Sequence, residues 1–345
     1  MSILIFISET KPTFFSLPTG EGWGGAPFLV LIFSAVSQGS KKYCIFATEI
    51  KKTKMMKKQL LFVVAALCFC STACKKEKIA IAGSGWQEIA IIDKKTGSIE
   101  WKHELDKDYE CNDIEVTPEG NVLFAYLKGA RLINKNHEII WDYKAKENEE
   151  IHSATRLGDG GYMIAVCGEP ARIVELDNNG NVKKEIPFMT LIFDSGSQFR
   201  QIAKAENGTY YVPLIEKQKV LQISPDGRIS NTFFMGKDLF SVKVLKNNNI
   251  LISCGRDGGF VEVDPETKSA YDMLPTNIIK GGSLLYVAEI IPYENGNKLI
   301  ANSNMRSNDK SQPLVIEINK NNDIIWSLPY NKEIKNITSI FSFFE

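Results

Sequence analysis

Seven polar side chains in the sequence have types and positions suited to a binding or catalytic site. Each stands beside a short apolar segment, and together they are Asp113, His152, Arg200, Gln201, Arg256, Asp257 and Glu289. His152 is the candidate for acid–base chemistry, because imidazole titrates near neutral pH. A general base also needs a nucleophile or a carboxylate within hydrogen-bond reach. No such partner can be chosen from spacing, so catalytic residues other than His152 stay unassigned.

These side chains also have a purely structural interpretation. Arg200, Glu289 and Arg256 can pair with one another inside a channel, since buried charges need partners. The sequence contains no P-loop, Rossmann glycine fingerprint, HExxH or GxSxG motif. It therefore indicates no cofactor and identifies no substrate.

Three of the seven cysteines fall in the predicted globular part: Cys111, Cys167 and Cys254. An odd number excludes a complete disulfide framework. Cys167 and Cys254 are more typical of small buried hydrophobic residues than of ligands. A Cys₃His set that includes His152 lacks the local CxxC pairing of recognisable zinc sites, so we expect no metal site.

The elements that must position these residues form a repeat. An apolar strand followed by a polar turn recurs six times between Ala90 and Asn319, with a period of about 45 residues, which is typical of four-stranded propeller blades. The copies are Ala90–Asp93, Arg131–Asn134, Val174–Asp177, Leu221–Ser224, Val261–Asp264 and Ile316–Asn319. A two-domain sandwich, the competing architecture, would not require a constant period.

A second unit, two strands joined by a Gly/Asn turn, occurs only five times. The five copies imply that the mature chain starts in the middle of the first blade. The strands of that blade are predicted at Lys78–Ala82, Glu88–Asp93 and Ser98–Trp101. The alternating segment Ile337–Phe343 is left to supply the innermost strand of that blade. We predict an all-β fold for residues 75–345: a six-bladed β-propeller closed by the C-terminal strand pairing into the first blade.

Antiparallel pairing places the start of a blade's first strand and the end of its second strand on the same face. Asp113, His152, Arg200, Gln201 and Glu289 stand at starts of first strands, whereas Arg256 and Asp257 follow the end of a second strand. The seven candidates are therefore predicted to ring one mouth of the central channel.

A segment before the repeats has the order of a secretory signal. Two lysines after Met55-Met56 precede the apolar run Leu60–Cys70, and Ser71–Ala73 supplies small residues before Cys74. The run is too short to span a bilayer as a helix. Ser-Thr-Ala-Cys resembles the lipobox of bacterial lipoproteins, which implies that Cys74 carries a lipid. Residues 55–74 are thus predicted to be a lipoprotein signal peptide.

Residues 1–54 precede this signal and show no repeat relation to the rest. We interpret them as an over-extended start or, alternatively, as a genuine and mostly disordered leader. Residues 75–345 carry 33 basic and 38 acidic side chains, a formal charge of −5, which argues against nucleic acid as a partner. Lys75 and Lys76 do not resemble an inner-membrane retention signal, so we expect a lipid anchor in the outer membrane of a bacterial cell envelope.

The segment Asp93–Trp101 resembles the tryptophan-docking motif of pyrroloquinoline-quinone-type (PQQ-like) propeller repeats, with an Asp, a Thr-Gly turn and a Trp. Trp141 and Trp326 occupy similar places in two other repeats. The resemblance implies a propeller in which these tryptophans pack between neighbouring blades. Quinoprotein dehydrogenases of that superfamily are larger and usually eight-bladed, and fold alone does not imply function.

The segment Ile151–Tyr162 resembles the His-then-Gly-turn repeats of bacterial arylsulfotransferase-like propellers. That resemblance implies a histidine near the central channel, here His152. Our leading hypothesis is a noncatalytic, envelope-anchored propeller that binds a protein or a glycan through one face. The alternative is a sulfotransferase- or lyase-like enzyme centred on His152, and quinone-dependent oxidation ranks third.

Overall fold

The computed structural model describes residues 3–7, 12–16, 28–37, 40–49, 75–107, 109–234, 236, 238–256, 259–274, 278–305, 307 and 309–345. The chain divides into two units, Met1–Cys74 and Lys75–Glu345. In the first unit, β1 (Ile3–Ile7), β2 (Pro12–Ser16), β3 (Phe28–Ser37) and β4 (Ser40–Glu49) form one sheet in the order β2-β1-β3-β4. The predicted signal peptide, residues 55–74, lies outside the described residues.

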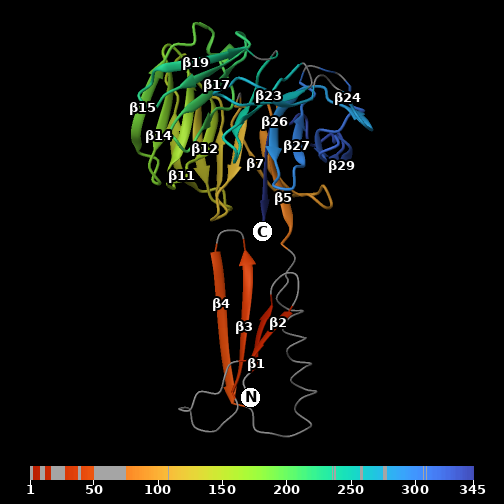
Figure 1. Ribbon diagram of the computed structural model, residues 1–345. Coiled ribbons are helices and arrows are strands. Elements are labelled where there is room, and N and C mark those ends of the chain that lie inside the picture. The colour runs from red at the N-terminus through yellow and green to blue at the C-terminus, as the bar shows by residue number, and fades with distance from the viewer. Residues whose placement is uncertain are drawn as a thin grey trace. The chain divides into compact units, whose positions relative to one another are not determined.

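The second unit is a ring of six four-stranded antiparallel sheets (Figure 1). Blade one holds β30 (Ser339–Phe344), β5 (Glu77–Ala82), β6 (Glu88–Asp93) and β7 (Ile99–Glu104). Blade two holds β8 (Asp113–Val116), β9 (Val122–Ala125), β10 (Gly129–Ile133) and β11 (Ile139–Lys144). Blade three holds β12 (Glu150–Arg156), β13 (Tyr162–Cys167), β14 (Ala171–Leu176) and β15 (Val182–Phe188).

The second half of the ring repeats this plan. Blade four holds β16 (Ala203–Lys204), β17 (Tyr210–Leu214), β18 (Lys219–Ile223) and β19 (Ile229–Phe234), and a short 3₁₀ turn η1 (Ser195–Ser197) precedes it. Blade five holds β20 (Val242–Val244), β21 (Ile250–Ser253), β22 (Phe260–Val263) and β23 (Ala270–Leu274). Blade six holds β26 (Val287–Pro292), β27 (Lys298–Asn302), β28 (Val315–Ile318) and β29 (Ile324–Leu328). A small hairpin, β24 (Ile278–Ile279) with β25 (Gly282–Ser283), lies between blades five and six along the chain and was not predicted.

The predicted six-bladed architecture and its closure are confirmed. β30 pairs antiparallel with β5, and the register places Ile340 opposite Ile81 and Ser339 opposite Ala82. In Figure 1 the dark blue C-terminal strand accordingly lies beside the orange β5. Joining the two ends of the unit in one sheet leaves no open edge between the first and last blades.

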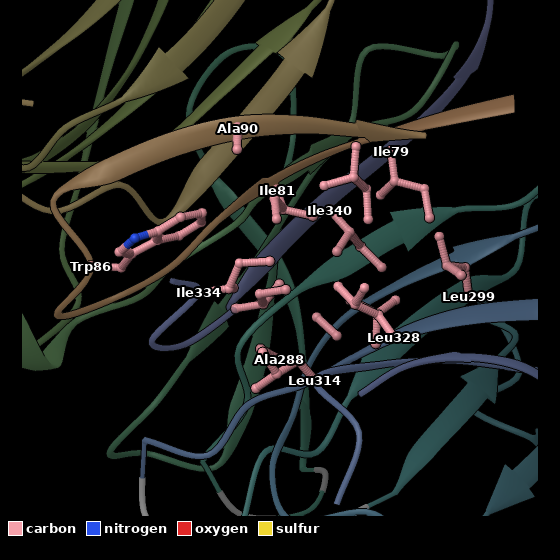
Figure 2. Packing of buried hydrophobic residues seen from close by; sticks show 14 of the residues in the cluster. Ile79, Ile81, Trp86, Ala90, Ala288, Leu299, Leu314, Leu328, Ile334 and Ile340 are labelled. Atoms are coloured by element: carbon pink, nitrogen blue, oxygen red, sulfur yellow. The ribbon is translucent and has the colours of Figure 1, made fainter. Parts of the chain in front are cut away.

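Hydrophobic cores fill the seams between blades. The second strand of blade three, Tyr162–Cys167, is apolar and buried along its whole length, because both of its faces are covered by neighbouring blades. Outermost strands alternate, as in Ile99–Glu104, because one face meets solvent. At the closing seam, Ile79, Ile81 and Ile340 of blade one pack with side chains of blade six (Figure 2).

Outermost strands also bond to the next blade. The indole Nε1 of Trp101 donates to the Lys135 carbonyl of blade two at 3.0 Å. Trp326 of blade six makes the equivalent bond to the Lys94 carbonyl of blade one at 2.8 Å. The expectation that these tryptophans pack between blades is confirmed.

The other predicted tryptophan, Trp141 of blade two, lies against the outer turn of blade three. A Cβ atom on Gly180 in that turn would come within 2.7 Å of the Trp141 ring. Gly180 also has a φ of +85°, a conformation that favours glycine. Both facts explain why a glycine occupies this turn.

Candidate functional site

The innermost strands, together with the residues just before β16 and β20, carry a belt of polar side chains around the channel, one from each blade. Its members stand at equivalent positions and are Asp113, Ser153, Gln201, Ser241, Glu289 and Ser339. Neighbours bond from blade to blade: Asp113 accepts from Ser153 Oγ at 3.0 Å, and Glu289 accepts from Ser339 Oγ at 2.8 Å. Each belt residue is at most 6% exposed. This arrangement makes the belt a part of the structural framework.

Gln201 crosses the channel. Its Nε2 donates to Glu289 Oε2 of blade six and to the Asn112 carbonyl of blade two, both at 2.9 Å. Three of the seven predicted mouth residues, Asp113, Gln201 and Glu289, thus meet in one network. Since each is buried and hydrogen-bonded, this network links blades and does not present an open site.

The network holds its charges in balance. The Lys243 ammonium lies 2.5 Å from Glu289 Oε1. Burial would lower the pKa of Lys243, but the carboxylates of Glu289 and Asp113 outweigh it and raise that pKa. Burial, with the nearby Glu289 charge, raises the pKa of Asp113 to about 8. At neutral pH Asp113 is therefore mostly protonated, and Lys243 is the counter-ion of the buried Glu289 carboxylate.

His152 lies in the same face of the ring but behind the surface, with 1% exposure. Asn112 Nδ2 lies 3.1 Å from His152 Nδ1 and also donates to Glu110 Oε1 at 3.0 Å. Because the amide donates, Nδ1 accepts and Nε2 carries the proton. Nε2 then donates to Glu150 Oε2 at 2.9 Å. Both ring nitrogens are engaged.

Electrostatics keep this histidine neutral. Burial, followed by the nearby positive charge of Arg200, lowers the pKa of His152 to about 4. The hydrogen bond from His152 lowers the pKa of Glu150, despite partial burial of the carboxyl group. A neutral imidazole therefore orients an ionised carboxylate at neutral pH. His152 is a positioning group in this arrangement, and the carboxylate of Glu150 is the group that it positions.

Glu150 lines an open recess of about 780 Å³ between the loops that precede β12 and β16. The recess is lined mainly by polar side chains and one aromatic ring, namely Lys128, Ala145, Lys146, Glu147, Asn148, Glu149, Glu150, Phe193, Asp194 and Ser195. Phe193 is 85% exposed, which is unusual for so large an apolar side chain. The recess therefore offers an apolar surface, hydrogen-bond donors and ionised acceptors together.

A buried glutamine, Gln198, holds the loop that carries Phe193 in place. The buried amide of Gln198 donates to the carbonyls of Ile192 at 2.8 Å and Gly168 at 2.9 Å, and accepts from the Gly168 N–H at 2.9 Å. Leu191 in this loop is 71% exposed and has a φ of +58°, a strained value for leucine. Strain retained in a braced loop is typical of functional sites.

The remaining predicted residues are more scattered. Arg200 is half-buried, donates to the Phe199 carbonyl at 3.0 Å, and acts on His152 through its charge. Arg256 instead pairs with Asp238 at 2.7 Å, and the Arg256 side chain is 60% exposed. Asp257 lies outside the described residues. The expected pairing of Arg200, Glu289 and Arg256 with one another is not observed among the described contacts.

The cysteines behave as expected of buried small residues. Cys111, Cys167 and Cys254 are buried and form no disulfide with one another. Burial raises the pKa of Cys167 to about 12, so its thiol is protonated at neutral pH. Within the described ranges, no group of three or more His, Cys, Asp or Glu side chains could hold a metal ion. In the same ranges, no helix has the length and apolar character needed to cross a membrane.

Sequence reasoning missed Glu150, Phe193 and Gln198. Glu150 carried a usable signal, since it stands two residues before His152 on the same strand. A register shift between Ile151 and Ser153 changes the pairing there, so simple alternation would not have located it.

Comparisons with known proteins support the fold of the second unit. Residues 85–323 match the family model described as Mal s 1 allergenic protein-like. A crystal structure of a protein of unknown function from Bacteroides caccae is 32% identical, with a TM-score of 0.75, and the match covers 78% of this chain and 99% of that one. No curated protein matches the chain.

Two more distant structures are similar in fold alone. A streptogramin B lyase structure is 13% identical, with a TM-score of 0.53, and the match covers 78% of this chain and 84% of that one. Raptor from Chaetomium thermophilum is also 13% identical, with a TM-score of 0.52, over 76% of this chain and 24% of that one.

Proposed function

The chain belongs to the Mal s 1 allergenic protein-like family, and from that premise we propose that it is a noncatalytic binding protein whose recess takes a glycan. The observation that carries this proposal is the pairing of an exposed aromatic ring with an oriented carboxylate. Phe193 stands in the recess, and Glu150 is fixed there by His152.

The chemistry of the recess suits a polyhydroxylated ligand better than an apolar one. Hydroxyl groups both donate and accept hydrogen bonds. The carboxyl oxygens of Glu150 and Asp194 can accept from them, and Lys128 and Lys146 can donate to them. The face of the Phe193 ring has a negative quadrupole that suits the C–H edge of a sugar.

We also propose that Cys74 anchors the protein by a lipid in the outer membrane of the cell envelope. β5 begins at Glu77, only three residues later, and ends at Ala82. Ala82 pairs with Ser339 near the polar belt, whereas Glu77 pairs with Phe344 at the opposite end of the sheet. An anchor at Cys74 would thus attach at the face opposite the recess, and the recess would remain accessible to a ligand.

We also propose that the blades of this protein are related to PQQ-like repeats. This relation is supported by Trp101 and Trp326, which donate to equivalent turn carbonyls of the following blades. It implies no quinone chemistry, since docking tryptophans serve the packing of blades.

The enzymatic alternative, a sulfotransferase- or lyase-like reaction at His152, has less support from the geometry. His152 is 1% exposed and both of its ring nitrogens are engaged. A base in this position would have to reach its substrate through Glu150. The distant likeness to a streptogramin B lyase supports the fold only.

A glycan array probed with the full chain tests the proposal. We expect binding to a restricted set of glycans that is lost in Phe193→Ala. The matched control is Tyr271→Ala, which removes an aromatic ring that is 64% exposed on β23 of blade five. Absence of glycan binding, or equal loss in both variants, would contradict the proposal. Phe193-dependent capture of an envelope protein without glycan binding would assign the recess to a protein ligand instead.

A further inference from the structure

Two of the three histidines in the chain face each other across the seam between blades one and two. His103 lies on β7, and His137 lies in the turn between β10 and β11. Their Nδ1 atoms are 3.0 Å apart. The third histidine, His152, is buried with 1% exposure. The facing pair is therefore the part of the chain where solvent can reach two imidazoles at once.

The pair is held by its surroundings. The rings of His103 and His137 are nearly parallel, at 15°, with centroids 5.2 Å apart. Trp101 lies parallel to His137, at 10°, with a centroid distance of 5.1 Å. The Trp101 indole is itself fixed by its bond to the Lys135 carbonyl. Both imidazoles are thus positioned by the contact that joins the two blades.

The backbone at His137 has a positive φ, a conformation that favours glycine. Its φ is +67°, and the equivalent residues of the other five outer turns, all at positive φ, are Gly97, Gly180, Gly227, Lys268 and Asn322. Three of these five are glycine, the residue that adopts this conformation without cost. Lys268 and Asn322 hold the same conformation, so the positive φ belongs to the turn, and glycine is the residue that fits it best.

We propose that His103 and His137 bind one divalent transition-metal ion, Cu²⁺ or Ni²⁺, through their Nδ1 atoms, with water in the remaining positions. At metal–nitrogen distances of about 2.0–2.1 Å, two ligands at a right angle lie about 2.9 Å apart, against about 3.4 Å for a tetrahedral site. The observed 3.0 Å is closer to the tetragonal geometry that Cu²⁺ and Ni²⁺ prefer.

Binding leaves the proton count unchanged. In the metal-free pair one Nδ1–H donates to the other Nδ1, so one Nδ1 proton must leave that bond. It moves to Nε2 of the same ring, which gives two neutral imidazoles with free Nδ1 lone pairs.

The charges around the pair permit a cation. Glu104 and Asp106 place negative charge near His103, and Arg131 places positive charge there. Arg131 is paired with Asp142 at 2.9 Å, and Lys135 is paired with Glu345. Both basic groups near the pair therefore have their own carboxylates.

Calorimetric titration of the full chain with Cu²⁺ tests this inference. We expect one equivalent to bind at pH 7.5, with at least tenfold weaker binding in His137→Gly and in His103→Gln. Glycine occupies the equivalent turn position in three other blades, so His137→Gly removes the ligand from a backbone that accepts glycine. Asn136→Ala, one residue earlier in the same exposed turn, is the matched control and should bind as the wild type does.

Electron paramagnetic resonance supplies a second readout. The bound Cu²⁺ should show coupling to two imidazole nitrogens, and this coupling should be reduced in His103→Gln. A metal that clips blade one to blade two should also raise the melting temperature of the wild type and not that of His137→Gly. Absence of binding, or binding unchanged in His137→Gly, would overturn the inference.

Discussion

His152 donates its Nε2 hydrogen to Glu150 across 2.9 Å, from a ring that is 1% exposed. The carboxylate at the other end of this bond lines the recess. A buried imidazole thus sets the direction of a group that a ligand can reach. This division between a hidden positioning residue and an accessible contact residue underlies the predictions for the site.

The buried imidazole makes stability depend on pH. The folded-state pKa of His152 is about 4, below the ordinary value of 6.5, so the folded protein binds fewer protons than the unfolded chain between these values. Neutral His152 therefore contributes to the free energy of unfolding in full above pH 6.5. This contribution, about 3 kcal/mol in total, is lost as the pH falls towards 4.

Urea unfolding at pH 7 and pH 4.5 measures this effect. The wild type should lose more free energy of unfolding than His152→Asn, which cannot take up the proton. Parallel losses in the two proteins would show that His152 does not contribute to the dependence on pH.

A second prediction concerns closure of the ring. Glu289 Oε2 accepts the Ile340 N–H at 2.9 Å and the Ser339 Oγ at 2.8 Å, and Oε1 pairs with Lys243. Glu289→Ala leaves these donors and the Lys243 charge uncompensated, so it should lower the free energy of unfolding by about 3 kcal/mol.

The double variant Glu289→Ala/Lys243→Met is the control for the charge. It should recover part of the loss, because the unpaired ammonium is gone. Urea unfolding of the two single variants and the double variant measures the coupling. Additive losses would contradict an interaction between Glu289 and Lys243.

A third prediction concerns blade docking without tryptophan. Lys184 of blade three stands where Trp101 and Trp326 stand in their blades, and its Nζ donates to the Pro225 carbonyl of blade four at 2.6 Å. Lys184→Met keeps most of the apolar stem and removes this bond. It should lower the free energy of unfolding by about 1 kcal/mol.

The neighbouring Lys183 is the matched control. It pairs with Asp159 on side chains that are both about half-exposed, and such surface pairs contribute little. Lys183→Met should therefore change the thermal unfolding midpoint less than Lys184→Met does. Equal shifts would mean that the bond to Pro225 adds nothing to blade docking.

The six-bladed ring could be predicted from the sequence because each blade repeats the same pattern of strands and turns. The missing copy of the Gly/Asn turn unit located the closing strand, and β30 indeed pairs with β5. The period of the repeats and the alternation of apolar residues are local properties of the chain, so both can be read from the sequence alone.

The site could be predicted only in outline, because its contacts join blades far apart in the sequence. Asp113, Gln201 and Glu289 do meet, but the reach of Gln201 across the channel depends on a side-chain conformation that spacing does not encode. Arg256 shared the expected strand position and yet pairs with Asp238. The exposure of Phe193 depends on how its loop is braced, which again is a tertiary property.

The role of Glu150 is tested most directly by the affinity of the full chain for a glycan selected on the array, measured by calorimetry for the wild type and Glu150→Gln. The control Glu216→Gln changes an exposed carboxylate outside the recess lining. We predict at least tenfold weaker binding for Glu150→Gln, the loss of one charge-assisted hydrogen bond, and no change for the control. Equal affinity in all three proteins would contradict a binding site built around Glu150.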